Sequence, residues 1–166
     1  MGWEHWIAAR VPAKSGTYVL ILESMNRQEV KVGKLGVMRM RPGFYFYVGS
    51  ALGPGGLKAR LAHHARESKS RHWHIDYVTA HTHWEEIWFT VCARKIEHQV
   101  VGLISSQLEV DLPLVGFGAS DCECESHFFY ASCKPSPDGI KKAIGTVGGE
   151  RLIWTRIWDQ KGARGP

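Results

Sequence analysis

The stretch Tyr45-Phe46-Tyr47-Val48-Gly49-Ser50-Ala51-Leu52-Gly53-Pro54-Gly55-Gly56 decides the fold of this chain. Its first half is aromatic, which is typical of a strand, and its second half is a glycine-rich turn. A short helix is predicted from Leu57 to Arg66, because Leu57 and Leu61 lie one helical turn apart with polar residues between them. The chain therefore passes from a strand into a helix through a tight turn.

That helix and the segment after it are strongly basic. Between Lys58 and His74 there are five Lys or Arg residues against Glu67 alone, which gives +4 of the total net charge of +5. The same stretch has four of the nine histidines, which are His63, His64, His72 and His74. Clustered positive charge behind a glycine-rich turn suits the binding of phosphate groups.

The remaining pattern predicts an α+β fold. Further strands are expected at 16–22, 30–32, 87–91, 126–132 and 151–158, and further helices at 96–108 and 140–144. Residues 73–78 fit either a helix or a strand. Together these elements predict a small, mainly antiparallel central sheet flanked by helices. The 166 residues are most simply one domain, with a core at about 15–132 and a C-terminal extension at 133–166.

Bulk properties restrict the class of protein. The first fifteen residues include Glu4, His5, Arg10 and Lys14 and have no long apolar run, so we expect neither a secretory signal nor a membrane span. A cytoplasmic location is the corresponding expectation. The four cysteines are then expected to be reduced thiols or metal ligands rather than disulfides. Oligomeric state is not predicted by the sequence.

The order of the motifs resembles the GIY-YIG nuclease superfamily, which includes the amino-terminal nuclease of UvrC and several homing and restriction endonucleases. Gly16-Thr17-Tyr18 stands at the GIY position and Tyr47-Val48-Gly49 at the YIG position. The words Tyr47-Val48-Gly49-Ser50-Ala51, Trp73-His74-Ile75-Asp76-Tyr77 and Gly116-Phe117-Gly118-Ala119-Ser120-Asp121-Cys122-x-Cys124-x-Ser126-His127 are similar to a subfamily that is sometimes fused to endonuclease III.

The resemblance implies an α/β sandwich and a metal-dependent endonuclease that hydrolyses phosphodiester bonds. DNA, in repair or in a structured form, is the expected substrate ahead of RNA, although the sequence does not separate the two nucleic acids. Its implied catalytic residues are Tyr18, Tyr47, Arg60 and His64, and Glu97 would hold Mg²⁺ or Mn²⁺. One departure is the 29 positions between Tyr18 and Tyr47, a longer separation than is usual in the superfamily. The extra residues, Glu23 to Pro42, are expected to form an enlarged N-terminal hairpin.

Elementary chemistry agrees with these roles. Arg60 can hold a phosphate through two parallel hydrogen bonds, and it lies one helical turn from His64, so both project from one face. A single carboxylate suffices for Mg²⁺, which keeps several waters. A tyrosine base is harder to explain, since its unperturbed pKa is about 10, unless Arg60, a metal or His64 assists it. Tyr45 shares a strand face with Tyr47 and competes for that role.

Three alternatives stay open around this assignment. Lys58, Arg66, Lys69, Arg71 and His74 are expected to hold the nucleic-acid backbone, and the chain could be a binding module without turnover. Separately, Cys122, Cys124, His127 and Cys133 offer a zinc site, although Cys-x-Cys is tighter than the usual zinc knuckle. His74 and Asp76 are either site residues themselves or part of a buried His–Asp hydrogen bond that holds the basic helix.

Overall fold

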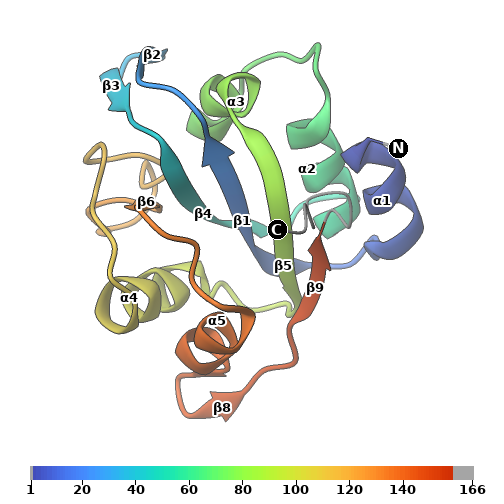
Figure 1. Cartoon of the computed structure of the whole chain (residues 1–166). Helices are drawn as coiled ribbons and strands as arrows, with labels where there is room; N and C mark the ends of the chain where they lie inside the picture. Colours follow the sequence, from blue (N-terminus) through green and yellow to red (C-terminus); the bar gives the residue numbers. More distant parts are fainter. Residues whose placement is uncertain (1, 159–166) are drawn as a thin grey trace, which may run out of the picture.

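The computed structural model describes residues 2–158 and has a five-stranded antiparallel sheet at its centre (Figure 1). The strand order is β6-β4-β1-β5-β9. These strands are β1 (Gly16–Ser24), β4 (Gly43–Ala51), β5 (His83–Val91), β6 (Phe128–Ala131) and β9 (Thr155–Trp158). Two small hairpins pair β2 (Gln28–Val32) with β3 (Gly36–Met40) and β7 (Thr146–Val147) with β8 (Glu150–Arg151).

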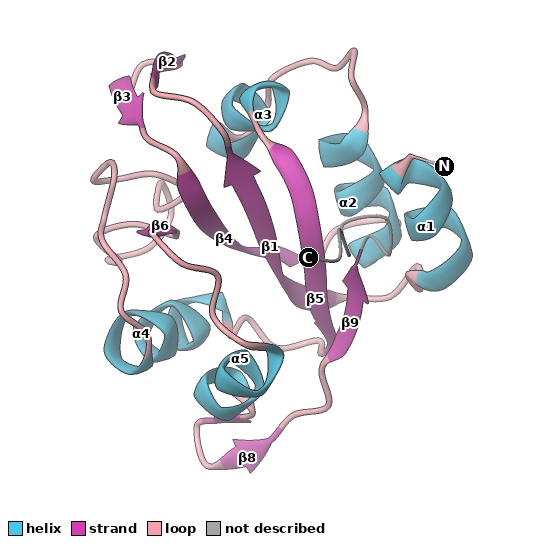
Figure 2. Ribbon diagram, viewed as in Figure 1, coloured by secondary structure: helices cyan, strands magenta, loops and turns pink. Residues whose placement is uncertain are grey.

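Helices cover both faces of the sheet (Figure 2). They are α1 (Trp3–Arg10), α2 (Gly56–Ala65), α3 (His74–Val78), α4 (Glu97–Gln107) and α5 (Pro137–Ile144), with a 3₁₀ turn at Thr79–His81. One hydrophobic core lies under α1, α2 and α3, and the other lies under α4 and α5. The predicted α+β sandwich is confirmed.

The alternation of side chains along β1 explains the two cores. Tyr18, Leu20 and Leu22 enter the core on the α2 side, whereas Val19 and Ile21 enter the core on the α4 side. Successive side chains of a strand point to opposite faces, so a strand buried on both sides reads as a continuous apolar run. This places Tyr18 beneath α2.

Most predicted elements are present, with two corrections. The inserted residues after β1 form the β2–β3 hairpin, as expected, and residues 74–78 of the ambiguous segment are helical. The single strand predicted at 151–158 is wrong, because Trp154 turns inward, donates from Nε1 to the Ile144 carbonyl at 2.9 Å and separates β8 from β9. Helix α1 was not predicted.

The C-terminal extension contributes to the sheet through a buried ion pair. Glu86 of β5 is fully buried, and its carboxylate accepts two hydrogen bonds from Arg156 of β9, at 2.7 and 2.8 Å. Lys134 lies 2.9 Å from the same carboxylate, and the Trp88 indole donates to it at 2.8 Å. This network holds β9 at the sheet edge; residues 159–166 of the predicted extension lie outside the described residues.

None of the helices between residues 2 and 158 is long and apolar enough to span a bilayer.

Candidate active site

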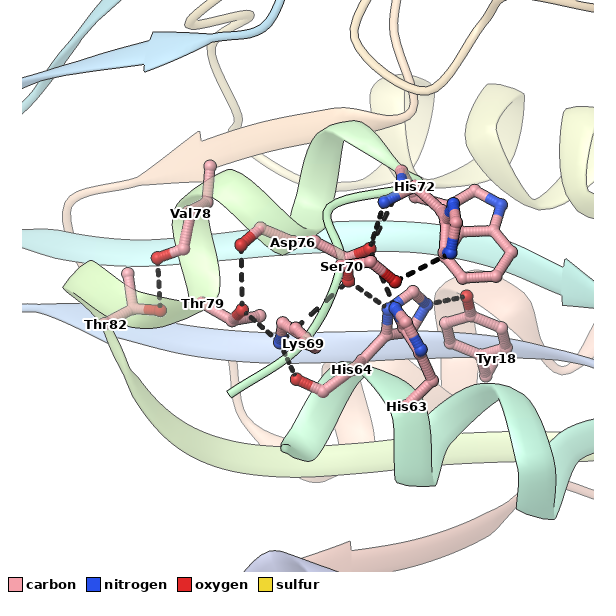
Figure 3. A network of polar contacts seen from close by, with 11 residues as sticks. Tyr18, His63, His64, Lys69, Ser70, His72, Asp76, Val78, Thr79 and Thr82 are labelled. Carbon is pink, nitrogen blue, oxygen red and sulfur yellow. Dashed lines mark hydrogen bonds and ion pairs between the residues drawn. The ribbon is translucent and has the colours of Figure 1, made fainter. Parts of the chain in front are cut away.

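A chain of three buried side chains joins β1, α2 and α3 (Figure 3). The Tyr18 hydroxyl lies 2.8 Å from His64 Nε2, and His64 Nδ1 lies 2.7 Å from Asp76 Oδ1. All three residues are at most 1% exposed. An ionised carboxylate only accepts hydrogen bonds, so Nδ1 donates to Asp76 and Nε2 accepts from the Tyr18 hydroxyl. We call this chain the Tyr–His–Asp relay.

Asp76 is held in the ionised state by its surroundings. Its Oδ2 accepts the backbone N–H groups of His72 and Trp73, both at 3.1 Å, and lies 3.2 Å from His63 Nε2. Burial acts to raise the pKa of Asp76, but the hydrogen bond from His64, the Trp73 N–H and the charge of Lys69 act to lower it, and the pKa is about 2. The carboxylate therefore stays charged at neutral pH and anchors the start of α3.

Burial disfavours the charged forms of the other two members, which are the imidazolium of His64 and the phenolate of Tyr18. It lowers the pKa of His64 to about 4, against the opposing influence of Asp76, so the ring is neutral at pH 7. Burial, followed by the neighbouring Tyr47, raises the pKa of Tyr18 well above its usual 10, while the charge of Arg60 lowers it. Tyr18 is accordingly a protonated donor to a neutral imidazole.

Tyr47 lies beside the relay on the next strand. Its ring centroid is 6.2 Å from that of Tyr18 and 6.3 Å from that of His64. Burial raises the pKa of Tyr47 strongly, and the charge of Arg60 partly offsets this. Tyr45, the other candidate on this strand face, makes different contacts: its hydroxyl donates to the Arg41 carbonyl at 3.1 Å and accepts from the Arg41 N–H at 2.8 Å. The Tyr45 hydroxyl is thus hydrogen-bonded to the turn between β3 and β4.

Gly49 allows the tyrosine of β1 to lie across β4. Tyr18 and Gly49 are cross-strand partners. A Cβ atom at Gly49 would lie 2.4 Å from the Tyr18 hydroxyl oxygen, closer than real contacts allow. The glycine of the Tyr-x-Gly word therefore makes room for the phenol that bonds His64.

Arg60 borders the relay on α2. Its guanidinium carbon lies 4.1 Å from the centroid of the Trp73 ring, a cation–π contact that fixes the side chain. The charge of Arg60 lowers the pKa of Tyr18, Tyr47 and His64, as it does only for groups nearby. The structure thus gathers four predicted catalytic residues: Tyr18, Tyr47, Arg60 and His64.

The predicted backbone-binding residues have mixed environments. Arg66 and Arg71 are exposed, and Lys58 is partly exposed. Lys69 instead braces the relay, because its ammonium bonds the His64 carbonyl and, at 2.7 Å, Thr79 Oγ1. His74 Nδ1 accepts the Gly118 N–H at 2.9 Å, so this ring anchors the loop before β6.

A groove of about 1260 Å³ opens at the His64 and Asp76 end of the relay. Its lining includes His64 and Asp76 together with three of the basic residues, which are Arg66, Lys69 and Arg71. Acidic side chains share this lining: Glu4, Glu23, Glu67 and Glu85. The basic stretch therefore borders a groove of mixed charge rather than a uniformly positive one.

Glu97 begins α4 and carries an unsatisfied oxygen. The residue is 4% exposed, and among the described residues its Oε2 has no hydrogen-bond partner. Its Oε1 lies 3.5 Å from the Lys95 ammonium, which also bonds Asp121 Oδ2 at 2.8 Å. Glu97 and Asp121 both act to raise the pKa of Tyr47, so these carboxylates lie on the Tyr47 side of the site. A buried carboxylate oxygen without a donor is suited to a cation.

Three of the four predicted zinc ligands come together in the loop before β6. The ligand atoms of Cys122, Cys124 and His127 lie within 4.8 Å of one another, and Cys122 Sγ is 3.0 Å from His127 Nε2. Cys133 is exposed beyond β6 and is not part of this group, which corrects the four-residue set. Burial, a hydrogen bond with Cys122 and the negative charges of Cys122 and Glu97 raise the pKa of the Cys124 thiol to about 11.

Sequence reasoning did not identify Asp76 as the partner of His64. A buried His–Asp hydrogen bond that holds the basic helix is one of the two interpretations that the sequence leaves open. In the structure, Asp76 forms this bond with His64 and contacts His63 as well, whereas His74 is not its partner. The spacing between His64 and Asp76 offers no local signal, because the two residues lie on different helices.

The family model described as "Domain of unknown function DUF123" matches residues 17–148. Neither a curated protein nor a solved structure matches the chain.

Proposed function

Since the chain belongs to the family of domains of unknown function DUF123, we propose its function from its own site: a metal-dependent endonuclease that hydrolyses phosphodiester bonds in DNA. The observation that carries this proposal is the Tyr–His–Asp relay, with 2.8 and 2.7 Å between its members. The resemblance of the ordered motifs to GIY-YIG nucleases supports the same reaction. Repair intermediates or other structured DNA are the proposed substrates.

The relay removes the difficulty of a tyrosine base. As the Tyr18 oxygen takes a proton from an attacking water, its own proton passes to His64 Nε2, and Asp76 stabilises the imidazolium that results. Tyr18 never becomes a free phenolate, which its burial disfavours. The arrangement matches the logic of a nucleophile, a histidine and an orienting aspartate, with a phenol in the first place.

Arg60 is proposed to bind the scissile phosphate. Its guanidinium is held against Trp73 beside Tyr18 and Tyr47, and a planar fork of donors suits two phosphoryl oxygens. Charge that builds on those oxygens as water attacks would be stabilised by this fixed cation. Tyr47, protonated because it is buried, is proposed to donate its hydroxyl proton as a hydrogen bond within the same site.

Glu97 is the residue proposed to hold Mg²⁺ or Mn²⁺. Its unpartnered Oε2 fits a hard cation, and Asp121 is a second carboxylate on the same lysine. When bound, the ion would neutralise charge on a phosphoryl oxygen. Lys95 is the cation that contacts Glu97 in the structure, so it would exchange partners when the metal binds.

Cleavage of supercoiled plasmid and of branched oligonucleotides tests this proposal. The wild-type chain should cut in Mg²⁺ or Mn²⁺ and stop when a chelator is added. Arg60→Ala and Glu97→Gln should abolish cutting, whereas Arg27→Ala and Glu109→Gln, at exposed positions away from the site, should not. Absence of cleavage by folded wild-type protein across these substrates and metals would refute the assignment.

A binding module without turnover is the second candidate, favoured by the strongly raised pKa of both buried phenols. It requires salt-dependent DNA binding that is lost when Lys58, Arg66 and Arg71 are replaced. Binding of this kind would be insensitive to chelators and to Glu97→Gln, which separates it from the nuclease.

A further inference from the structure

The loop before β6 brings two thiols and an imidazole together. Cys122, Cys124 and His127 place their ligand atoms within 4.8 Å of one another, with Cys122 Sγ 3.0 Å from His127 Nε2. On a tetrahedral zinc ion, bonds of about 2.3 Å to sulfur and about 2.0 Å to nitrogen separate ligand atoms by about 3.5 to 3.8 Å. The cluster thus needs only small side-chain shifts to surround such an ion.

We propose that Cys122, Cys124 and His127 form a binding site for a thiophilic divalent cation of the zinc class, with ligands of a different kind from the carboxylate oxygens proposed at Glu97. Thiolate and imidazole ligands favour zinc, whereas Mg²⁺ takes oxygen ligands. The three protein ligands leave one position open to water or to an outside donor. This proposal does not depend on nuclease activity.

The backbone around His127 is already fixed for this role. The His127 carbonyl accepts the Val48 N–H at 3.0 Å, and the His127 N–H donates to the Phe117 carbonyl at 2.7 Å. His127 is 3% exposed, while the two cysteines are partly exposed, so an ion can reach the thiols from solvent. One ligand therefore lies at the rigid sheet edge, and two lie on the turn that precedes it.

A bound ion would affect the candidate active site, because the loop that carries the cluster also contacts Tyr47. A Cβ atom at Gly118 would lie 2.9 Å from the His127 Cβ and 3.0 Å from Tyr47 Cε2, so the loop passes between the two side chains in close contact with both. The residues from Gly116 to Ser126 have turns but no helix or strand. A bound ion ties both ends of the Cys122–His127 turn together and steadies the wall beside Tyr47.

Cobalt(II) titration of the reduced, metal-stripped full chain tests the site. Co²⁺ should bind at one equivalent and produce a thiolate-to-cobalt charge-transfer band with the intense visible bands of tetrahedral cobalt, and Zn²⁺ should remove both. Cys122→Ser and Cys124→Ser should lose the charge-transfer band or reduce it to about half, whereas Cys133→Ser, the matched exposed control, should retain it. Glu97→Gln should also retain the band, because this substitution removes neither thiolate.

Any of three results would overturn the proposal: no charge-transfer band from folded protein with four free thiols, an unchanged band in both Cys122→Ser and Cys124→Ser, or loss of the band in Glu97→Gln. Circular dichroism of each variant establishes folding. Hydrogen exchange gives a second readout, since Zn²⁺ should slow exchange at the His127 amide in the wild type but not in Cys124→Ser. Failure of plasmid cleavage has no bearing on these readouts.

Discussion

Replacing Asp76 with asparagine should exchange the donors and acceptors of the two hydrogen bonds in the relay while leaving its side chains in place. The amide oxygen of asparagine can still accept the backbone N–H groups of His72 and Trp73, which places the amide NH₂ toward His64. His64 Nδ1 must then accept, so Nε2 becomes protonated and donates to Tyr18. Tyr18 can no longer pass its proton to His64.

The magnitude follows from the carboxylate's surroundings. The pKa of Asp76 is about 2 in the folded chain against 3.8 for the free group, a difference worth about 2 kcal/mol of folding free energy at neutral pH. Asp76→Asn should lose about that much stability. Loss of general-base assistance typically costs about 100- to 10,000-fold in rate, so cleavage under single-turnover conditions should fall by that range.

Two assays check the two consequences. Urea unfolding gives the stability change, with Asp111→Asn as the matched control. The side chain of Asp111 makes an exposed ion pair with Arg41, and its backbone bonds to Tyr130 do not depend on the side chain, so this substitution should change stability little. Nitrogen NMR shifts of the His64 ring report the tautomer without requiring activity. If the Nε2 lone pair persists in folded Asp76→Asn, or if that variant cleaves at the wild-type rate, the relay mechanism is refuted.

Three further predictions concern stability. Gly49→Ala should cost about 1 to 3 kcal/mol in urea unfolding, because its Cβ would press on the Tyr18 hydroxyl, and Gly53→Ala, with open space around it, should cost far less; equal effects would contradict the packing argument. The free energy of unfolding should decline as the pH falls from about 6.5 toward 4, because the His64 ring has a pKa of 6.5 in the unfolded chain and about 4 in the folded one. The loss is about 3 kcal/mol, and the same decline in a His64→Gln variant would contradict this assignment. Arg156→Ala should cost about 3 to 5 kcal/mol by leaving Glu86 buried without its main partner, and an unchanged melting temperature would argue against the ion pair as the β9 anchor.

The sequence predicted the sheet well because its strands are buried and apolar or aromatic. The predicted strand at 16–22 and the aromatic run that starts at Tyr45 lie within β1 and β4, and the hairpin expected between them is present. Helix α1 escaped prediction because its apolar residues, Trp3, Trp6 and Ile7, are few and only Ile7 is fully buried. The break at Trp154 escaped because a tryptophan has high strand propensity, and the carbonyl that its indole bonds lies on another element.

The sequence identified candidate residues that the structure brings together, but it did not predict the hydrogen bonds between them. Two-residue periodicity puts Tyr45 and Tyr47 on one face, and only the Arg41 contacts separate them. The bond between His64 and Asp76 requires α3 to be helical and to lie against α2, which local propensity did not determine. Asp121, which shares Lys95 with Glu97, likewise lies on a loop more than twenty residues away in the chain.

The close contact between the Tyr18 hydroxyl and Gly49 can form only when β1 and β4 pair in the observed register. A slip of one residue between β1 and β4 would bring Val48 or Ser50 opposite Tyr18, and either side chain would occupy the space that the phenol now fills. A misaligned sheet therefore has no place for the bond to His64. Strand register and the hydrogen bond between Tyr18 and His64 therefore depend on the same contact, so a molecule with misaligned strands would lack the Tyr–His–Asp relay on which the proposed function rests.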